Sequence, residues 1–291
     1  MLTNLRATLR RFGWYRSLSW RVARWVDWKD NVFPESLPSA STPYGFKLQV
    51  RNHPANRAML KGMFEPEEVA LIQKQLAQTD VFIDVGANIG FYTCLARQQG
   101  KYVVAVEPQP RNLRCVYQNL LSNNWNDLAE VYPLGLGAKP GILTLYGASG
   151  PSASLIPGWA EYSDRFRQTI PISTLDIIAG QRFAGKRVFV KIDVEGYEYG
   201  VLKGALQLLS LAPRPVWLVE ICLNEYHPSG INPDYKAAFQ LFWDHGYEAR
   251  SADKENKLIR PEDVDRWIAS KRCDSGTINY LFSAPSGSGG A

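Results

Sequence analysis

The amino-acid sequence predicts an α/β protein built on a doubly wound, mainly parallel sheet. Strand-like runs and helix-like runs alternate along most of the chain. A glycine turn joins a buried strand at residues 81–85 to a helix at 91–99. Several later strands end on carboxylates, where open sheets bind their ligands. With 291 residues and 45% hydrophobic content, the chain can form one large domain of this kind.

The first 30 residues differ in composition from the rest of the chain. They carry seven Arg or Lys, two Asp and four of the nine Trp, which predicts a basic amphipathic helical extension, with a linker up to residue 45. Such a helix could lie on an anionic membrane surface. We favour the alternative that it packs on the domain, since its two aspartates dilute the charge.

Charge and cysteine content narrow the class of protein. Beyond residue 30 the chain holds 26 basic and 26 acidic residues, a balance that disfavours a nucleic-acid groove. The four cysteines show no CxxC pair and no zinc-site spacing. Arginines interrupt the N-terminus, so no secretory hydrophobic segment is evident. We therefore expect a cytoplasmic protein.

The region before the glycine turn reads as a strand at 46–50, a turn at 52–56 and a returning strand at 57–63. A helix is expected from Pro66, because proline suits the first helical position and acids follow it. These elements lead into the strand at 81–85.

The turn after that strand has the spacing Asp84-x-Gly86-x-Asn88-x-Gly90. A dinucleotide fingerprint would place glycine where Asn88 stands, which disfavours a nicotinamide oxidoreductase. Glycines are needed where the chain turns sharply or where a ligand approaches the backbone. The order of these residues is similar to the first motif of S-adenosylmethionine (SAM) dependent methyltransferases.

The next strand, 102–107, ends on Glu107. A carboxylate at this position can accept both ribose hydroxyls of an adenosine. Pro110 then begins a helix to about residue 121, with Leu113, Tyr117, Leu120 and Leu121 expected on its apolar side.

The remaining elements continue the alternation. A long polar loop at 147–162, inside an inserted hairpin, is expected to serve as a lid or binding loop. Strands are expected at 130–136, 187–196, 216–221, 247–250 and 279–282, and the strands of the hairpin at 141–146 and 169–172. Helices are expected at 198–209, from 232 and from 261. Residues 285–291 are expected to form a flexible tail.

Three segments, FIDVGANIGFYT, VAVEPQPRN and VKIDVEGYEYGVLKGAL, resemble the FkbM-type methyltransferases over about residues 46–284. The resemblance implies a Rossmann-like seven-stranded sheet with the last strand antiparallel. It implies methyl transfer from SAM to an oxygen, often a hydroxyl of a sugar, glycan or secondary metabolite. On the matching positions it places Asp84, Gly86, Asn88, Gly90 and Glu107 around SAM. Where family members carry an acid after the third strand, this chain has Leu136-Gly137-Ala138.

Methyl transfer to an oxygen requires alignment of that oxygen and removal of its proton. Asp193 and Glu195 alternate at a strand end, and His227 follows the next strand, so these three are the catalytic candidates. A less favoured alternative has Asp193 and Glu220 holding a divalent metal. An inactive member of the fold that binds a membrane or partner through residues 1–30 is another alternative.

Overall fold

The computed structural model describes residues 37–51, 53–147, 152–161 and 167–285. Backbone contacts divide the chain into two units, Met1–Pro38 and Ser39–Ala291. The predicted amphipathic extension and its membrane contact lie outside the described residues, and the predicted domain limits stay a prediction. Within the described ranges, no helix is long and apolar enough to span a bilayer.

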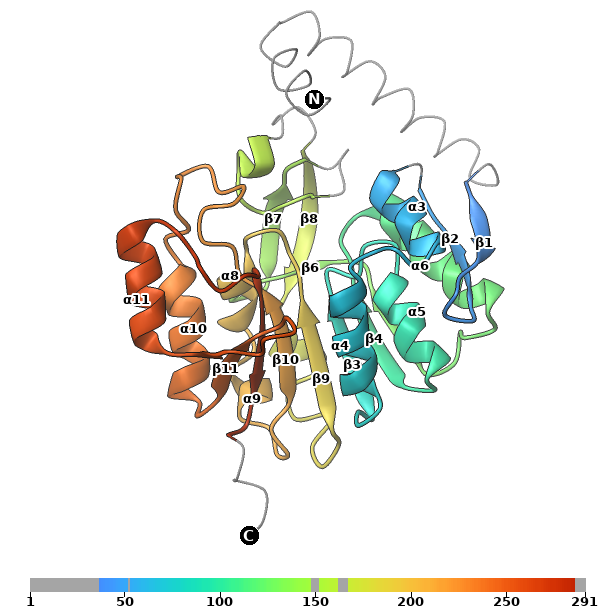
Figure 1. Cartoon of the computed structure of the whole chain (residues 1–291). Coiled ribbons are helices and arrows are strands. Elements are labelled where there is room, and N and C mark those ends of the chain that lie inside the picture. The colour runs from blue at the N-terminus through green and yellow to red at the C-terminus, as the bar shows by residue number, and fades with distance from the viewer. Residues whose placement is uncertain (1–36, 52, 148–151, 162–166, 286–291) are drawn as a thin grey trace, which may run out of the picture. The chain divides into compact units, whose positions relative to one another are not determined.

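The second unit is built on an eight-stranded sheet in the order β12-β11-β13-β10-β9-β3-β4-β5 (Figure 1). Strands β10, β9, β3, β4 and β5 are parallel, and β13 is antiparallel to its neighbours β10 and β11. This confirms the predicted seven-stranded sheet with an antiparallel last strand; the two-residue β12 adds an edge. The bounds are β3 Val81–Val85, β4 Tyr102–Val106, β5 Ala129–Tyr132, β9 Val188–Ile192, β10 Val216–Glu220, β11 Glu248–Ser251, β12 Leu258–Ile259 and β13 Asn279–Ser283.

Helices cover both faces of the sheet, as alternating apolar side chains require. Val81, Ile83 and Val85 of β3 join the core cluster that also contains apolar residues of α7 to α11. Phe82 belongs to the opposite face, where its ring packs 5.4 Å from that of Phe189. The helices are α3 Pro54–Leu60, α4 Pro66–Leu76, α5 Phe91–Gln98, α6 Pro110–Ser122, α7 Leu175–Ile178, α8 Glu198–Leu202, α9 Leu206–Leu209, α10 Tyr235–Asp244 and α11 Pro261–Ser270.

A second, three-stranded sheet stands beside the large one, in the order β6-β8-β7. Its strands are β6 Gly135–Leu136, β7 Gly141–Leu145 and β8 Gln168–Ser173. The antiparallel pairing of β7 with β8 confirms the predicted hairpin. The predicted strand 130–136 is instead split between β5 and β6, because Pro133 lacks the N–H that a continuous ladder needs. The predicted lid at 147–162 lies partly outside the described residues.

Several expected elements were wrong. The predicted strand at 57–63 lies within and just after helix α3, which begins at Pro54, and β2 (Lys47–Gln49) pairs instead with β1 (Ser39–Ser41). On α6, Tyr117 and Leu121 are 44% and 57% exposed, so the buried side runs through Leu113 and Val116 instead.

The predicted helix 198–209 was also wrong as one element, because it breaks into α8 and α9 at Gly204. A Cβ at Gly204 would stand 2.2 Å from the carbonyl oxygen of Gly137. The two backbones therefore approach more closely than any side chain would allow.

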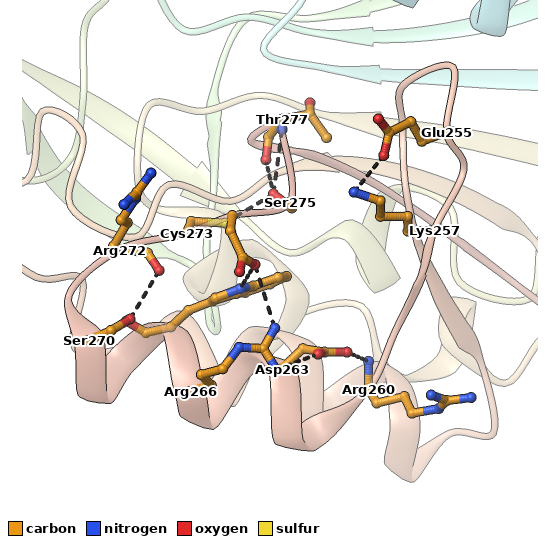
Figure 2. A network of polar contacts seen from close by, with 12 residues as sticks. Glu255, Lys257, Arg260, Asp263, Arg266, Ser270, Arg272, Cys273, Ser275 and Thr277 are labelled. Atoms are coloured by element: carbon orange, nitrogen blue, oxygen red, sulfur yellow. Dashed lines mark hydrogen bonds and ion pairs between the residues drawn. The ribbon is translucent and has the colours of Figure 1, made fainter.

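The surface around α11 carries a network of paired charges (Figure 2). The Asp263 carboxylate accepts the backbone N–H of Arg260 at 3.0 Å and pairs with Arg266 at 2.9 Å. Asp274 accepts the indole N–H of Trp267 and lies 3.5 Å from Arg266. Each of these carboxylates therefore has a partner close to solvent.

Candidate functional site

A cavity opens at the carboxyl edge of the large sheet, where β3, β4 and β9 end. Its walls come from the turn after β3, the end of β4, the segment after β9, the small sheet and the connection before α4. This is the edge at which the sequence predicts ligand binding.

The turn after β3 forms one wall of the cavity. Gly86 and Asn88 line it, and both adopt left-handed backbone conformations, with φ of +85° and +52°. A Cβ at Gly86 would lie 1.9 Å from the carbonyl oxygen of Asp193. Glycine is therefore required here because the end of β9 crosses directly against the turn.

The other two residues of the predicted motif lie behind this wall. Asp84 is 1% exposed and accepts the hydroxyl of Thr93 at 2.6 Å, and burial raises the pKa of its carboxyl. Gly90 begins α5 with φ +82°, and a Cβ there would press on Val116 of α6 at 3.3 Å. Both residues are absent from the cavity lining: the side-chain hydrogen bond of Asp84 is to α5, and Gly90 lies against α6. Their predicted role toward SAM stays a prediction.

Glu107 lies at the end of β4, lines the cavity and is 4% exposed. One carboxylate oxygen accepts the backbone N–H of Asn88 at 2.9 Å. The other accepts the backbone N–H of Gln109 at 2.9 Å and the amide of Asn112 at 3.2 Å. Burial raises the pKa of Glu107 to about 7, against these hydrogen bonds, which favour the ionised form.

The end of β9 forms a second charged wall. Lys191, Asp193 and Glu195 all line the cavity. The predicted strand 187–196 was too long, because β9 ends at Ile192 and the left-handed backbone at Glu195 cannot continue a strand, so alternation does not account for the position of Glu195. The Lys191 ammonium lies 2.9 Å from the Asp193 carboxylate, and Lys191 is 3% exposed. Burial opposes the charge on Lys191, yet the carboxylates of Asp193 and Glu68 hold its pKa well above the usual value.

The loop after β9 is shaped around Trp159. Glu195 has φ +57°, and its carboxylate accepts the Trp159 indole N–H at 2.8 Å. A Cβ at Gly196 would lie 2.3 Å from the indole ring. Burial, with the nearby Asp193 charge, raises the pKa of Glu195 to about 7. Trp159 was not predicted as a site residue. The sequence feature that could have indicated it is a lone tryptophan in a polar loop.

The ring of His227 packs edge-to-face against Trp159, with the two ring centroids 6.0 Å apart, and His227 is absent from the cavity lining. Its Nδ1 accepts the backbone N–H of Ser229 at 3.2 Å, which places the proton of the neutral ring on Nε2. Burial lowers the pKa of His227. In this arrangement neither ring nitrogen offers a free lone pair to the cavity.

Negative charge exceeds positive charge in the cavity. Glu65, Glu107, Asp193 and Glu195 face a single lysine, Lys191, among the described residues that line it. Such a site favours a cationic ligand. SAM carries a sulfonium and an ammonium against one carboxylate, and its ribose diol can be met by the buried Glu107 carboxylate, so the residues present fit this cofactor.

The carboxyl of Glu220, at the end of β10, lies just outside this set. Burial and the charges of Asp193 and Glu195 raise its pKa well above the usual range. Among the described residues, no three His, Cys, Asp or Glu side chains are arranged to hold a metal ion.

Residues 84–249, more than half of the chain, match the family model described as the methyltransferase FkbM domain. A similar characterised protein is the hexuronic acid methyltransferase AglP of Haloferax volcanii. The two are 29% identical over 248 residues, which cover 84% of this chain and 94% of that protein.

Two solved structures are also similar. The O-methyltransferase TomG of Streptomyces achromogenes has a TM-score of 0.41 and 12% identity, over 76% of this chain and 80% of TomG. A SAM-dependent methyltransferase of Agrobacterium tumefaciens has a TM-score of 0.43 and 9% identity, over 86% and 70% of the two chains. The Rossmann-like arrangement itself rests on the strand order given above.

Proposed function

The chain belongs to the FkbM methyltransferase family and is a SAM-dependent methyltransferase, and on this premise we propose that it methylates a hydroxyl oxygen of a sugar or glycan. The name of the similar archaeal protein, a hexuronic acid methyltransferase, supports a sugar as the acceptor. The observation that carries the proposal is the shared cavity: Asp193 lines the same space as Gly86 and Glu107.

Gly86, Asn88 and Glu107 would hold SAM. Glu107 Oε1 already accepts two N–H bonds, whereas Oε2 accepts one and keeps a lone pair. Oε2 would receive the ribose diol. The left-handed turn at Gly86 lets the ligand lie close to the backbone. When bound, SAM supplies a methyl group already activated by its sulfonium.

Asp193 would act as the general base. Its carboxylate lies at the cavity wall, is one-third exposed on its side chain and is held by Lys191 at 2.9 Å. It can accept the hydroxyl proton of the acceptor while the acceptor oxygen approaches the methyl carbon. Glu195, tied to Trp159, would orient the loop around the acceptor. His227 is the competing base and would need to release the N–H of Ser229.

A divalent metal at Asp193 and Glu220 is the less favoured form of the mechanism. The ammonium of Lys191 already stands between Asp193, at 2.9 Å, and Glu68, at 3.6 Å, where a cation would otherwise be drawn. We therefore expect chelator treatment to leave methyl transfer unchanged. Loss of activity in chelator and its recovery with magnesium would assign Asp193 to a metal instead.

The proposal is tested with purified full-length protein and SAM carrying a deuterated methyl group. A panel of neutral hexosides, hexuronides and non-sugar alcohols is incubated with the protein, and products are followed by mass spectrometry. Label on a sugar hydroxyl is the expected result. Label on a hexuronide carboxyl, on nitrogen, or on the non-sugar alcohols alone would overturn the proposed acceptor, although the protein would remain a methyltransferase.

A further inference from the structure

Lys191 occupies an unusual position for a lysine. It lies in β9, in the middle of the sheet, with Asp84 of β3 and Leu218 of β10 as its neighbours in register. It is 3% exposed, and its ammonium lies 4.9 Å from the centre of the Tyr92 ring. Burying an ammonium is costly unless it is paired and hydrogen-bonded, so its partners decide where it stays.

Two carboxylates lie close to this ammonium. Asp193 Oδ2 lies 2.9 Å from Lys191 Nζ on the cavity side. Glu68 Oε1 lies 3.6 Å away on the side of α4, and Glu68 is 8% exposed. Glu68 is fixed in turn, because its Oε2 accepts the side-chain amide of Asn279 at 2.9 Å. Glu68 Oε1 has no hydrogen-bond partner, and the Lys191 ammonium at 3.6 Å is the positive charge that faces it.

We propose that Lys191 is a positioning residue that holds the Asp193 carboxylate at the cavity wall, with Glu68 and Asn279 holding the lysine. This inference rests on the proposed role of Asp193 as the base. Because Lys191 binds one carboxylate oxygen, Oδ2, the other oxygen stays open to the acceptor hydroxyl. The row Asn279–Glu68–Lys191–Asp193 thus links β13, α4 and β9 to the reacting oxygen.

The surroundings make the lysine necessary. In the described part of the chain, the titratable groups that face this pair are acids: the phenol of Tyr92 and the carboxyl groups of Glu65, Glu68, Asp84, Glu195, Glu198 and Glu220. Lys191 is the only cationic side chain among these described groups, and its ammonium binds the Asp193 carboxylate at 2.9 Å. Replacing Lys191 removes both the positive charge and the hydrogen bond that hold this carboxylate.

A direct test follows the Asp193 carboxyl carbon by NMR in the full-length protein labelled at aspartate carboxyl carbons. The signal is assigned by its loss in Asp193→Asn. In Lys191→Met we expect the titration midpoint of this signal to rise by at least about one pH unit. Lys236→Met is the matched control, since it removes a lysine from the surface pair with Asp265 at 2.5 Å. An Asp193 midpoint equal to wild type in Lys191→Met would overturn the inference.

Should Lys191→Met fail to fold, Lys191→Gln keeps a donor for Asp193 without the charge, and the same rise is expected. The activity readout is the pH profile of methyl transfer to an acceptor that the wild type uses. The acid limb should move upward and turnover should recover at high pH, whereas a purely structural defect lowers turnover equally at all pH values. The NMR arm needs no acceptor, so a failure of the proposed sugar methylation leaves this inference separately testable.

Discussion

The carboxylates around α11 lie near solvent beside hydrogen-bond donors, whereas those of the cavity are mostly buried. On α11 and the turn after it, Asp263 and Asp274 each have an N–H or guanidinium partner at the surface (Figure 2). The hydrogen bond from Trp267 lowers the pKa of Asp274. In the cavity, burial raises the pKa of Glu107 and of Glu195 to about 7.

The difference separates carboxylates whose charge is balanced within the fold from carboxylates whose charge a bound ligand would balance. A folded chain gains nothing by crowding buried carboxylates around one lysine, and strongly perturbed acids in a cleft mark functional sites. A cationic cofactor supplies the charge that the cavity lacks. The two regions should therefore respond differently to neutral substitutions, to pH and to ligand.

The largest effect is expected for Asp193→Asn. This change keeps the size of the side chain and removes the proton acceptor, so turnover should fall by about 10²–10⁴-fold while SAM binding is retained. Steady-state methyl transfer and calorimetric SAM titration measure the two quantities. Asp263→Asn, the matched change on α11, should leave both unchanged. A larger loss of turnover in His227→Ala than in Asp193→Asn would transfer the base role to the histidine.

Glu107→Ala should act on binding instead of chemistry. Loss of hydrogen bonds to a charged group weakens SAM binding by about 1.5–3 kcal/mol, or roughly 10- to 150-fold. Calorimetry on the folded variant checks this. The control variant is Glu130→Ala, which removes a carboxylate of β5 that lies outside the cavity and is bound by Arg182 and Tyr132. Equal SAM affinity in Glu107→Ala and wild type would remove the ribose assignment.

Stability should depend on pH in opposite ways for a buried carboxyl and for a carboxylate paired with an arginine. Glu198, whose pKa burial raises to about 8 from 4.5, binds more protons folded than unfolded. It therefore lowers the free energy of unfolding as pH rises from about 4.5 to about 8. Glu130, whose pKa the Arg182 hydrogen bond lowers to about 2, adds stability that is lost as pH falls from about 4.5 to about 2.

Urea unfolding across this pH range measures both slopes. Glu198→Gln removes the titrating carboxyl, so the free energy of unfolding should decline less between about pH 4.5 and 8. The variant should still fold, because the amide oxygen can accept the backbone N–H groups of Val194 and Gly196. An unchanged slope would mean that Glu198 is ionised in the folded protein as readily as in the unfolded chain.

The smallest effect is expected for Arg266→Met on α11. Its ion pairs with Asp263 and Asp274 lie at the surface, where solvent screens the attraction between the charges. Thermal unfolding should shift little, and turnover should not change. A loss of turnover comparable to that of a cavity variant would show that the two regions are coupled.

The proposed cofactor half of the site rests on local sequence patterns. A strand, a glycine turn and an acid at the next strand end are local patterns, and the structure brings Gly86, Asn88 and Glu107 together. Spacing alone could not show that Asp84 would accept a hydrogen bond from Thr93, or that Gly90 would pack against Val116. Both contacts depend on how α5 and α6 pack.

The proposed acceptor half depends on contacts between distant segments. Trp159 reaches Glu195 across 36 positions, and Glu68 reaches Asn279 across 211. No periodicity reports such pairs. Helix α3 was missed for a different reason: residues 57–63 have no strong alternation, and the proline at 54 serves as a helix start as readily as a turn residue.

The most direct test of the account is a structure of the protein with S-adenosylhomocysteine bound. We expect the ribose hydroxyls within about 3.2 Å of the Glu107 carboxylate, and the sulfur atom on the side of the cavity lined by Asp193. A nucleoside bound elsewhere, or a sulfur atom facing away from the end of β9, would contradict the assignment of this cavity as the methyl-transfer site.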